Sequence, residues 1–239
     1  IALITIKWTL VVILFLILLA SLFFFQIKKQ QSEYHKNELQ VWASMKEGIT
    51  YIYRTKEILG ALCLDMFAVL FGGAVAMIPV FASDILKVGA DGFGILNAAS
   101  DIGSMMIIVT LSFIPLRKNQ GKILIGVVAG FGLCIIGFGL SKLYWLSFLF
   151  LMLSGIFDGI SVVIRGTIVQ LKTPDHIRGR VMSANSIFIM SSNEMGQFES
   201  GVAAKLLGVV RSVVFGGTMT VLIALFVGKF VPKLRKMEY

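Results

Sequence analysis

Long apolar runs alternate with short polar segments along most of this chain. Seven runs have the length that a helix needs to cross a bilayer, because a hydrocarbon core of ~30 Å requires ~20 helical residues. They occupy residues 1–25, 57–82, 92–115, 122–140, 143–168, 180–207 and 212–231. Short connections join the last six runs, so neighbouring spans run antiparallel. The pattern predicts an all-α membrane protein, a polytopic helical bundle.

The longest connection, residues 26–56, begins polar and then becomes amphipathic. Its apolar side chains recur at steps of three and four residues: Leu39, Trp42, Met45, Ile49, Ile52 and Tyr53. We expect a helix along the cytoplasmic membrane surface, with Trp42 toward the membrane interior and lysines toward the headgroups. The expected organisation is a transmembrane helix at 1–25, this cytoplasmic loop at 26–56, a six-helix bundle at 57–231 and a cytoplasmic tail at 232–239.

Composition and charge agree with a membrane protein. The mean hydropathy is +0.88 over 239 residues, far above that of soluble proteins. The net charge of +9 suggests nucleic acid at first, but 16 of the 22 Lys and Arg residues fall on one side of the predicted spans. That side is the cytoplasm by the positive-inside rule, and it holds the carboxyl terminus. The cations therefore indicate topology and contact with lipid headgroups, which leaves nucleic-acid binding a remote alternative.

The start of the chain lacks the features of a signal peptide. Ile1 stands within an apolar run, with no charged leader and no cleavage site. An odd number of spans also places the two chain ends on opposite sides of the membrane. We expect a fragment of a longer protein, with residues 1–25 as the last span of the missing amino-terminal half.

Metal, cofactor and enzyme chemistry find little support in the sequence. Cys63 and Cys134 lie within separate spans, without the spacing of a metal or redox motif. His35 and His176 are the only histidines and fall in different loops, so we expect no metal site and no cofactor. An integral-membrane enzyme remains an alternative, but no nucleophile and base stand at a catalytic spacing.

Acidic residues inside the predicted spans carry the functional hypothesis. In order of candidacy for proton coupling they are Asp65, Asp158, Glu199, Asp101 and Glu194. A carboxylate in hydrocarbon costs a few kcal/mol, so each must face water or protein, pair with a cation or bind a proton. For Asp65, a bond to hydroxyls of a neighbouring helix is equally compatible with the sequence.

Basic residues near the same spans have structural or gating interpretations. Arg165 follows Asp158 by two helical turns, so a direct contact needs long side chains or a partner helix. We expect Arg165 to reach the headgroups or anchor a loop, with a structural ion pair as the alternative. Asp175, Arg178 and Arg180 follow in the next loop and are candidates for gating or structural charges.

The helix that begins near Arg180 is the most polar. At 100° per residue its polar and small residues form a stripe of Asn185, Ser192, Gly196 and Glu199, flanked by Asn193 and Ser200, with Gln197 further round. We expect Asn185, Ser192, Asn193 and Gln197 to line a substrate cavity, unless the stripe is a buried seam between helices. Glu194 points away from Asn185. We expect it either to form a hydrogen bond to another helix or to serve as a proton site.

Aromatic and methionine side chains are candidates for an adaptable apolar cavity wall. They are Phe67, Phe71, Met77, Phe188 and Met190, each of which can also simply face lipid.

Glycines four residues apart, Gly126 with Gly130 and Gly155 with Gly159, predict close helix packing. The pairs at 72–73 and 216–217 can pack or bend a helix, and we expect packing.

Two segments resemble a known family of membrane proteins. VWASMKEGITYIYRTKEILGALCLDMFAVLFGGAVAMIPVFA and TPDHIRGRVMSANSIFIMSSNEMGQFESGVAAKLLG are similar to the carboxy-terminal half of bacterial major facilitator exporters of the enterobactin exporter and macrolide efflux type. The resemblance implies twelve spans in two six-helix bundles in the bacterial inner membrane. It also implies proton-driven export of a small amphipathic drug, macrolide or siderophore by alternating access. Lysophospholipid flipping and a non-transporting membrane subunit are the alternatives.

Two segments depart from that family pattern. Relatives commonly read L-R-A-A-P-A-x-G where this chain has LNAASDIG at residues 96–103, so an arginine and a proline are missing and Asp101 is added. The loop at 115–122 keeps only part of the superfamily's basic gating motif. These departures concern substrate and gating rather than the fold.

Overall fold

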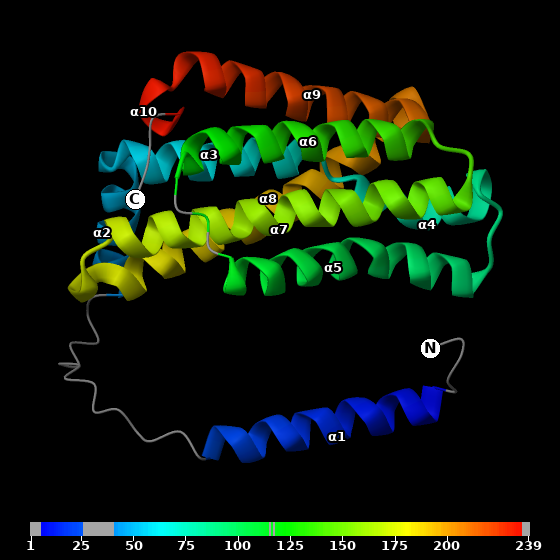
Figure 1. Cartoon of the computed structure of the whole chain (residues 1–239), viewed down its shortest axis with the longest axis horizontal. Coiled ribbons are helices and arrows are strands. Elements are labelled where there is room, and N and C mark those ends of the chain that lie inside the picture. Colours follow the sequence, from blue (N-terminus) through cyan, green and yellow to red (C-terminus); the bar gives the residue numbers. More distant parts are fainter. Residues whose placement is uncertain (1–5, 26–40, 115, 117, 236–239) are drawn as a thin grey trace. The chain divides into compact units, whose positions relative to one another are not determined.

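The computed structural model describes residues 6–25, 41–114, 116 and 118–235, which form two compact units. The first unit, Ile1–Val41, contains α1 (Ile6–Phe25), an apolar helix whose side chains are mostly exposed (Figure 1). The second unit, Trp42–Tyr239, contains the remaining helices. The predicted residues Leu39 and His35 lie outside the described part of the chain.

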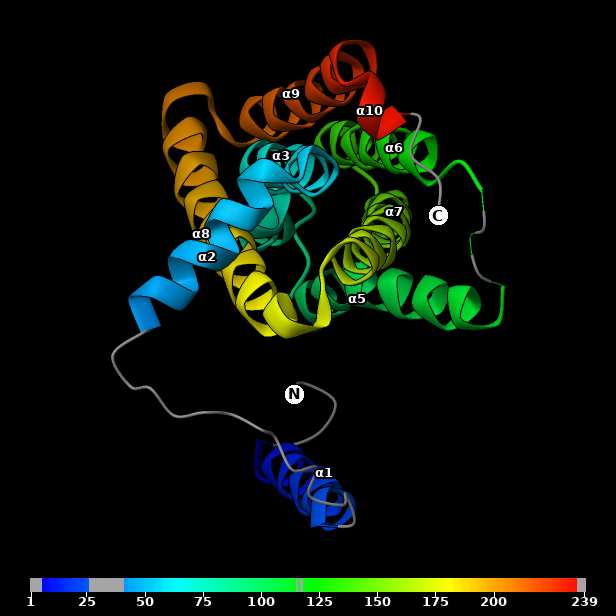
Figure 2. The same cartoon turned by 90° about the vertical axis from the view of Figure 1, so that its left-hand side faces the viewer.

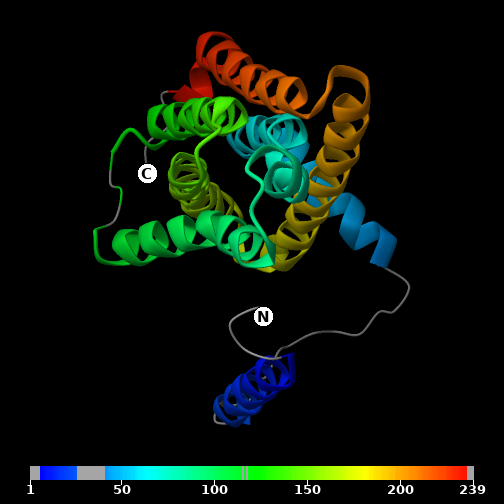
Figure 3. The same ribbon diagram turned by 90° about the vertical axis from the view of Figure 1, so that its right-hand side faces the viewer.

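Helices are the only regular secondary structure among the described residues of the second unit. Its elements are α2 (Val41–Arg54), α3 (Lys56–Phe71), η2 (Ala74–Met77), α4 (Ile78–Val80), η3 (Phe81–Ile85), α5 (Ala90–Phe113), α6 (Gln120–Leu140), α7 (Tyr144–Lys172), η4 (Asp175–Ile177), α8 (Arg178–Leu207), α9 (Val209–Phe230) and α10 (Pro232–Arg235). Seen end-on, α5, α7, α6, α9 and α8 follow one another around the bundle, and α3 packs against α7, α8 and α9 (Figures 2 and 3).

Five helical segments are long and apolar enough to cross a membrane by length and composition: Lys56–Ile85, Ala90–Phe113, Gln120–Leu140, Tyr144–Lys172 and Val209–Phe230. This result confirms a polytopic helical bundle. Two of the seven predicted spans do not meet this criterion of length and apolar composition. The apolar part of α1, Leu10–Phe25, is shorter, and α8 is long enough but too polar.

The amphipathic pattern after residue 40 forms a helix, α2. Ile52 is fully buried, and Met45 and Ile49 are partly buried. Trp42 and Tyr53 stay exposed, at 82% and 58% of their surface. The insertion of Trp42 into a membrane stays a prediction. Since α2 and α10 lie at the same end of the bundle (Figure 1), we refer to it as the α2 end.

The span predicted at 57–82 is interrupted after Phe71. Gly72 ends α3 with an N–H bond of 2.7 Å to the carbonyl of Ala68, and a tight 3-10 turn follows Gly73. A Cβ on Gly72 would come within 2.6 Å of the Phe131 ring. The expectation of packing alone was therefore incomplete, because these glycines also break the helix. By contrast, residues 216–217 continue within α9 and serve close packing.

Glycines bring α5 and α7 into backbone contact. A Cβ on Gly155 would overlap the carbonyl oxygen of Ser100, and one on Gly103 would overlap that of Met152. The hydroxyl of Ser104 donates to the Gly155 carbonyl at 2.8 Å. The predicted packing role of Gly155 is confirmed, whereas it was wrong for Gly126, which has no neighbouring atom within 4 Å of an added Cβ.

The buried apolar side chains form two clusters along the bundle. One joins α2, α3, α6, α7 and α8 near the α2 end and includes Ile58, Leu64, Leu124, Ile164 and Ile168. The other fills the opposite end around Ile78, Phe81, Leu96, Phe138 and Leu151. The polar site described below lies on α3 and α7, which both contribute to the first cluster.

We predict that Gly155→Ala destabilises the bundle, whereas Gly166→Ala in the same helix does not. The added methyl at position 155 has no room against α5 and costs about 1–3 kcal/mol, but nothing lies within 4 Å at position 166. Thermal unfolding in detergent should show a melting temperature several degrees lower for the first variant only. Equal melting temperatures would contradict the close α5–α7 contact.

Candidate functional site

An ion pair between α3 and α7 is the centre of the site. Nη1 of Arg165 donates to Oδ2 of Asp65, and each residue is only 6% exposed. Asp65 lies nine residues after the start of α3, about 14 Å along the helix axis. The expectation that Arg165 reaches the headgroups was wrong, because an acid on another helix compensates its charge within the bundle.

The sequence places both charges on the buried stripes of their helices. Asp65 shares its face with Ala61 and Ala68, which are buried four residues before and three residues after it. Arg165 shares its face with Ser161 and Ile168, which are buried in the same way. Neither charge can turn outward without exposing these buried neighbours, so the two meet where α3 packs on α7.

A second carboxylate lies beside this pair. Asp65 and Asp158 line the same small cavity together with Ser161, and Phe131 and Phe157 are among its other walls. Its volume is about 10 Å³, room for about one water molecule. Within the described chain, the hydroxyl of Ser161 and Nε of Arg165 are buried without a hydrogen-bond partner. Of these two groups, Ser161 lines the cavity, so its hydroxyl can form a hydrogen bond to a water there, and a proton can bind to either carboxylate.

The formal charge of this group changes with a single proton. With both carboxylates ionised, Asp65, Asp158 and Arg165 sum to −1. One bound proton brings the sum to zero. An uncompensated charge in a dry apolar interior is costly, so the protonated and deprotonated forms favour different hydration of the site.

The polar stripe of α8 has two parts. Gly196 and Ser200 pack against α3 and the turn after it: a Cβ on Gly196 would come within 2.7 Å of the Val69 carbonyl, and the Ser200 hydroxyl donates to the Gly73 carbonyl at 3.3 Å. This part is a seam between helices. Asn185 and Glu199 are partly buried, and Oδ1 of Asn185 has no partner among the described residues.

A second, larger pocket lies between α3 and α8 and has a volume of about 370 Å³. It is lined by Ile49, Met66, Phe67, Leu70, Ala184, Ile187, Phe188, Ser191, Ser192 and Met195. Of the predicted cavity residues it includes Phe67, Phe188 and Ser192. It does not include the others: Phe71, Met77, Asn185, Met190, Asn193 and Gln197. Met66 and Met195 were not predicted from the sequence, although Met66 stands next to Asp65.

Several predicted polar residues are exposed on α5 and α8. Asp101 lies near the middle of α5, and Asn193, Glu194 and Gln197 lie within α8. A charge exposed at this depth is costly against lipid. These faces of the two helices therefore need water or protein next to them.

The charges at the α2 end form two ion pairs. Asp175 pairs with Arg178 within the turn after α7, and Arg180 pairs with Glu47 of α2. The hydroxyl of Tyr51 also donates to the Lys172 carbonyl at 2.5 Å. The contacts of Glu47 and Tyr51 were not predicted from the sequence, because their partners are more than a hundred residues away.

Comparison with known proteins agrees with this architecture. The model of a family of major facilitator type, described as a transmembrane secretion effector, matches residues 2–239. No curated protein and no solved structure matches the chain. The family is one of membrane transporters, in agreement with the apolar helices. Because the match spans nearly all of the sequence, the chain belongs to the transmembrane secretion effector family of the major facilitator superfamily.

Proposed function

We propose that the protein is part of a proton-coupled exporter of small amphipathic molecules that works by alternating access. The buried group of Asp65, Asp158 and Arg165 carries this proposal, because it can bind one proton in the middle of a transport bundle. Membership of a family of transporters supports the general role. Proton coupling is inferred from the chemistry of the site, and export is inferred from the resemblance to major facilitator exporters and the description of the family.

The energetics of one proton are sufficient for export. A proton that moves down ~100 mV and one pH unit releases ~2.3 plus ~1.4 kcal/mol, enough for a gradient of a few hundredfold. In the proposed cycle, the neutral site favours a closed, dry bundle. Loss of the proton leaves a net negative site that favours an open, hydrated one, so that proton movement drives the change of access.

The pocket between α3 and α8 is the proposed substrate site. Its volume is within the usual range for small-molecule sites, and none of the described residues that line it is charged. Met66, Met195, Phe67 and Phe188 give it adaptable apolar walls. Such a pocket favours an amphipathic, largely apolar drug over a highly charged siderophore. A lipid-like substrate is compatible with the same walls.

We also propose that a second six-helix bundle covers the exposed polar faces of α5 and α8. The mid-helix position of Asp101 and the exposure of Glu194 support this, because lipid is a poor environment for either. In that arrangement residues 1–25 are the last span of the other bundle, and 26–56 connect the two. The concentration of Lys and Arg supports an inner-membrane protein with the α2 end and the carboxyl terminus in the cytoplasm.

We predict that Asp65→Asn lowers proton-driven efflux at least tenfold in the two-bundle transporter. The substitution removes the acid held by Arg165, and inverted vesicles under a pH gradient measure the loss. Asp91→Asn, at an exposed acid in the first turn of α5, is the control and should transport normally. Transport of a drug-like dye is then compared with transport of labelled lysophospholipid in the same vesicles. This comparison distinguishes drug export from lipid flipping.

A double variant separates coupling from a purely structural ion pair. Asp65→Asn with Arg165→Gln removes both charges of the pair and leaves Asp158, which a bound proton neutralises, so we expect the double variant to fold. We expect efflux to stay low. Wild-type efflux by the double variant would show that the pair only holds α3 to α7.

Asp158→Asn should separate substrate movement from proton movement. The remaining Asp65 and Arg165 form a neutral pair, so the site no longer needs a proton to close. We expect substrate exchange at equal pH to continue while accumulation driven by a pH gradient falls to background. Unchanged gradient-driven accumulation would exclude Asp158 from coupling.

The two-bundle arrangement predicts that the 239-residue chain alone does not transport. In proteoliposomes it should insert and remain helical by circular dichroism but show no saturable substrate flux. The complete two-bundle transporter in matched vesicles is the positive control. Saturable flux by the chain alone would contradict the proposal.

A further inference from the structure

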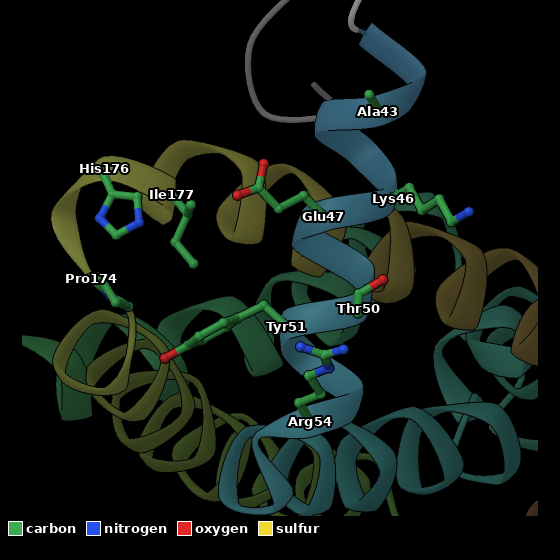
Figure 4. A pocket seen from close by; sticks show the side chains of 9 residues that line it. All are labelled: Ala43, Lys46, Glu47, Thr50, Tyr51, Arg54, Pro174, His176 and Ile177. Carbon is green, nitrogen blue, oxygen red and sulfur yellow. The ribbon is translucent and has the colours of Figure 1, made fainter.

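A large pocket at the α2 end is separate from the proposed transport site. It lies between α2 and the turn that joins α7 to α8, and its volume is about 560 Å³. Figure 4 shows its lining residues: Ala43, Lys46, Glu47, Thr50, Tyr51, Arg54, Pro174, His176 and Ile177. The proposed export mechanism uses none of them.

Three contacts hold the two walls of this pocket in place. Tyr51 reaches across from α2, and its hydroxyl donates to the Lys172 carbonyl at 2.5 Å (Figure 4). Glu47 pairs with Arg180 at the start of α8. Gly48 lets α2 approach closely, since a Cβ there would come within 2.8 Å of the Arg180 carbonyl carbon. The pocket is therefore formed before any ligand binds.

The lining of the pocket favours an anion. Lys46, Arg54 and His176 contribute basic side chains, and Glu47 is the one acidic residue among the described lining. Arg180 compensates the charge of Glu47, whereas none of the ion pairs between described residues uses Lys46 or Arg54. In Figure 4 the guanidinium of Arg54 lies close to Tyr51, with His176 across the pocket, and Lys46 extends to the other side of α2.

The surroundings of the pocket indicate where that anion comes from. Trp42 and Tyr53 on the same helix are exposed, and aromatic residues of this kind are enriched at the membrane–water interface. Basic pockets on membrane proteins at this level bind the headgroups of anionic lipids. The planar guanidinium of Arg54 suits phosphate oxygens, to which it can donate two parallel hydrogen bonds.

We propose that the pocket between α2 and the α7–α8 turn binds the phosphate of an anionic phospholipid, with Arg54 as its main charged contact. The ligand contacts α2 on one side and the turn of Pro174, His176 and Ile177 on the other. It thereby joins the segment before α3 to the α7–α8 connection. The proposal does not depend on transport activity.

Native mass spectrometry of the full chain in nonionic detergent tests this site. The protein is titrated with dioleoylphosphatidylglycerol, with dioleoylphosphatidylcholine and with inorganic phosphate. We expect the anionic lipid to bind most tightly. Arg54→Gln should weaken that binding about fivefold, because one basic residue near an anionic headgroup contributes about 1 kcal/mol.

Two further variants keep the result interpretable. Lys122→Gln removes an exposed cation at the same end of the bundle but outside the pocket, and should bind lipid like wild type. Arg54→Lys keeps the positive charge but loses the two parallel hydrogen bonds, so its affinity should lie between those of wild type and Arg54→Gln. Equal affinity of Arg54→Gln and wild type, or equally tight binding of the zwitterionic lipid, would overturn the proposal. Equally tight binding of inorganic phosphate would overturn the assignment to lipid.

Discussion

The guanidinium of Arg165 needs a carboxylate next to it, because it is buried between helices. Asp65 meets that need from α3, and this one contact determines how α3 faces α7 near the α2 end. Removal of Arg165 would leave two buried carboxylates without a positive charge beside them. The small cavity shared with Asp158 exists beside the pair for the same reason, since a second acid in this interior requires space for a proton or a water.

The helices were largely predictable because a bilayer restricts what a chain can do. Backbone groups in hydrocarbon must be satisfied within a segment, so long apolar runs become helices, as in α5, α6, α7 and α9. The period of apolar residues likewise predicted α2. The break after Phe71 was not expected, since a glycine pair at 72–73 has the same sequence signature whether it packs or bends. Only the backbone, in which α3 ends at Gly72 and a 3-10 turn follows Gly73, shows the break.

Contacts between helices were much harder to predict. Asp65 and Arg165 are a hundred residues apart, and periodicity says which residues share a face but not which helix that face meets. The stripe on α8 illustrates this limit. Its residues do share a face, yet Gly196 and Ser200 pack on α3 while Ser192 lines an apolar pocket. Glu47 and Tyr51 were missed for the same reason, since their partners lie across the α7–α8 turn.

The interruption after α3 has a mechanical consequence for the buried ion pair. A continuous helix transmits a rotation at one end to the other, but the regular hydrogen-bond ladder stops at Gly72 and resumes only in short turns. Asp65 is on α3, before the break, whereas Ile78 and Phe81 hold the segment after the break in the opposite core cluster. α3 can therefore tilt about Gly72 while the segment that follows stays packed in that cluster.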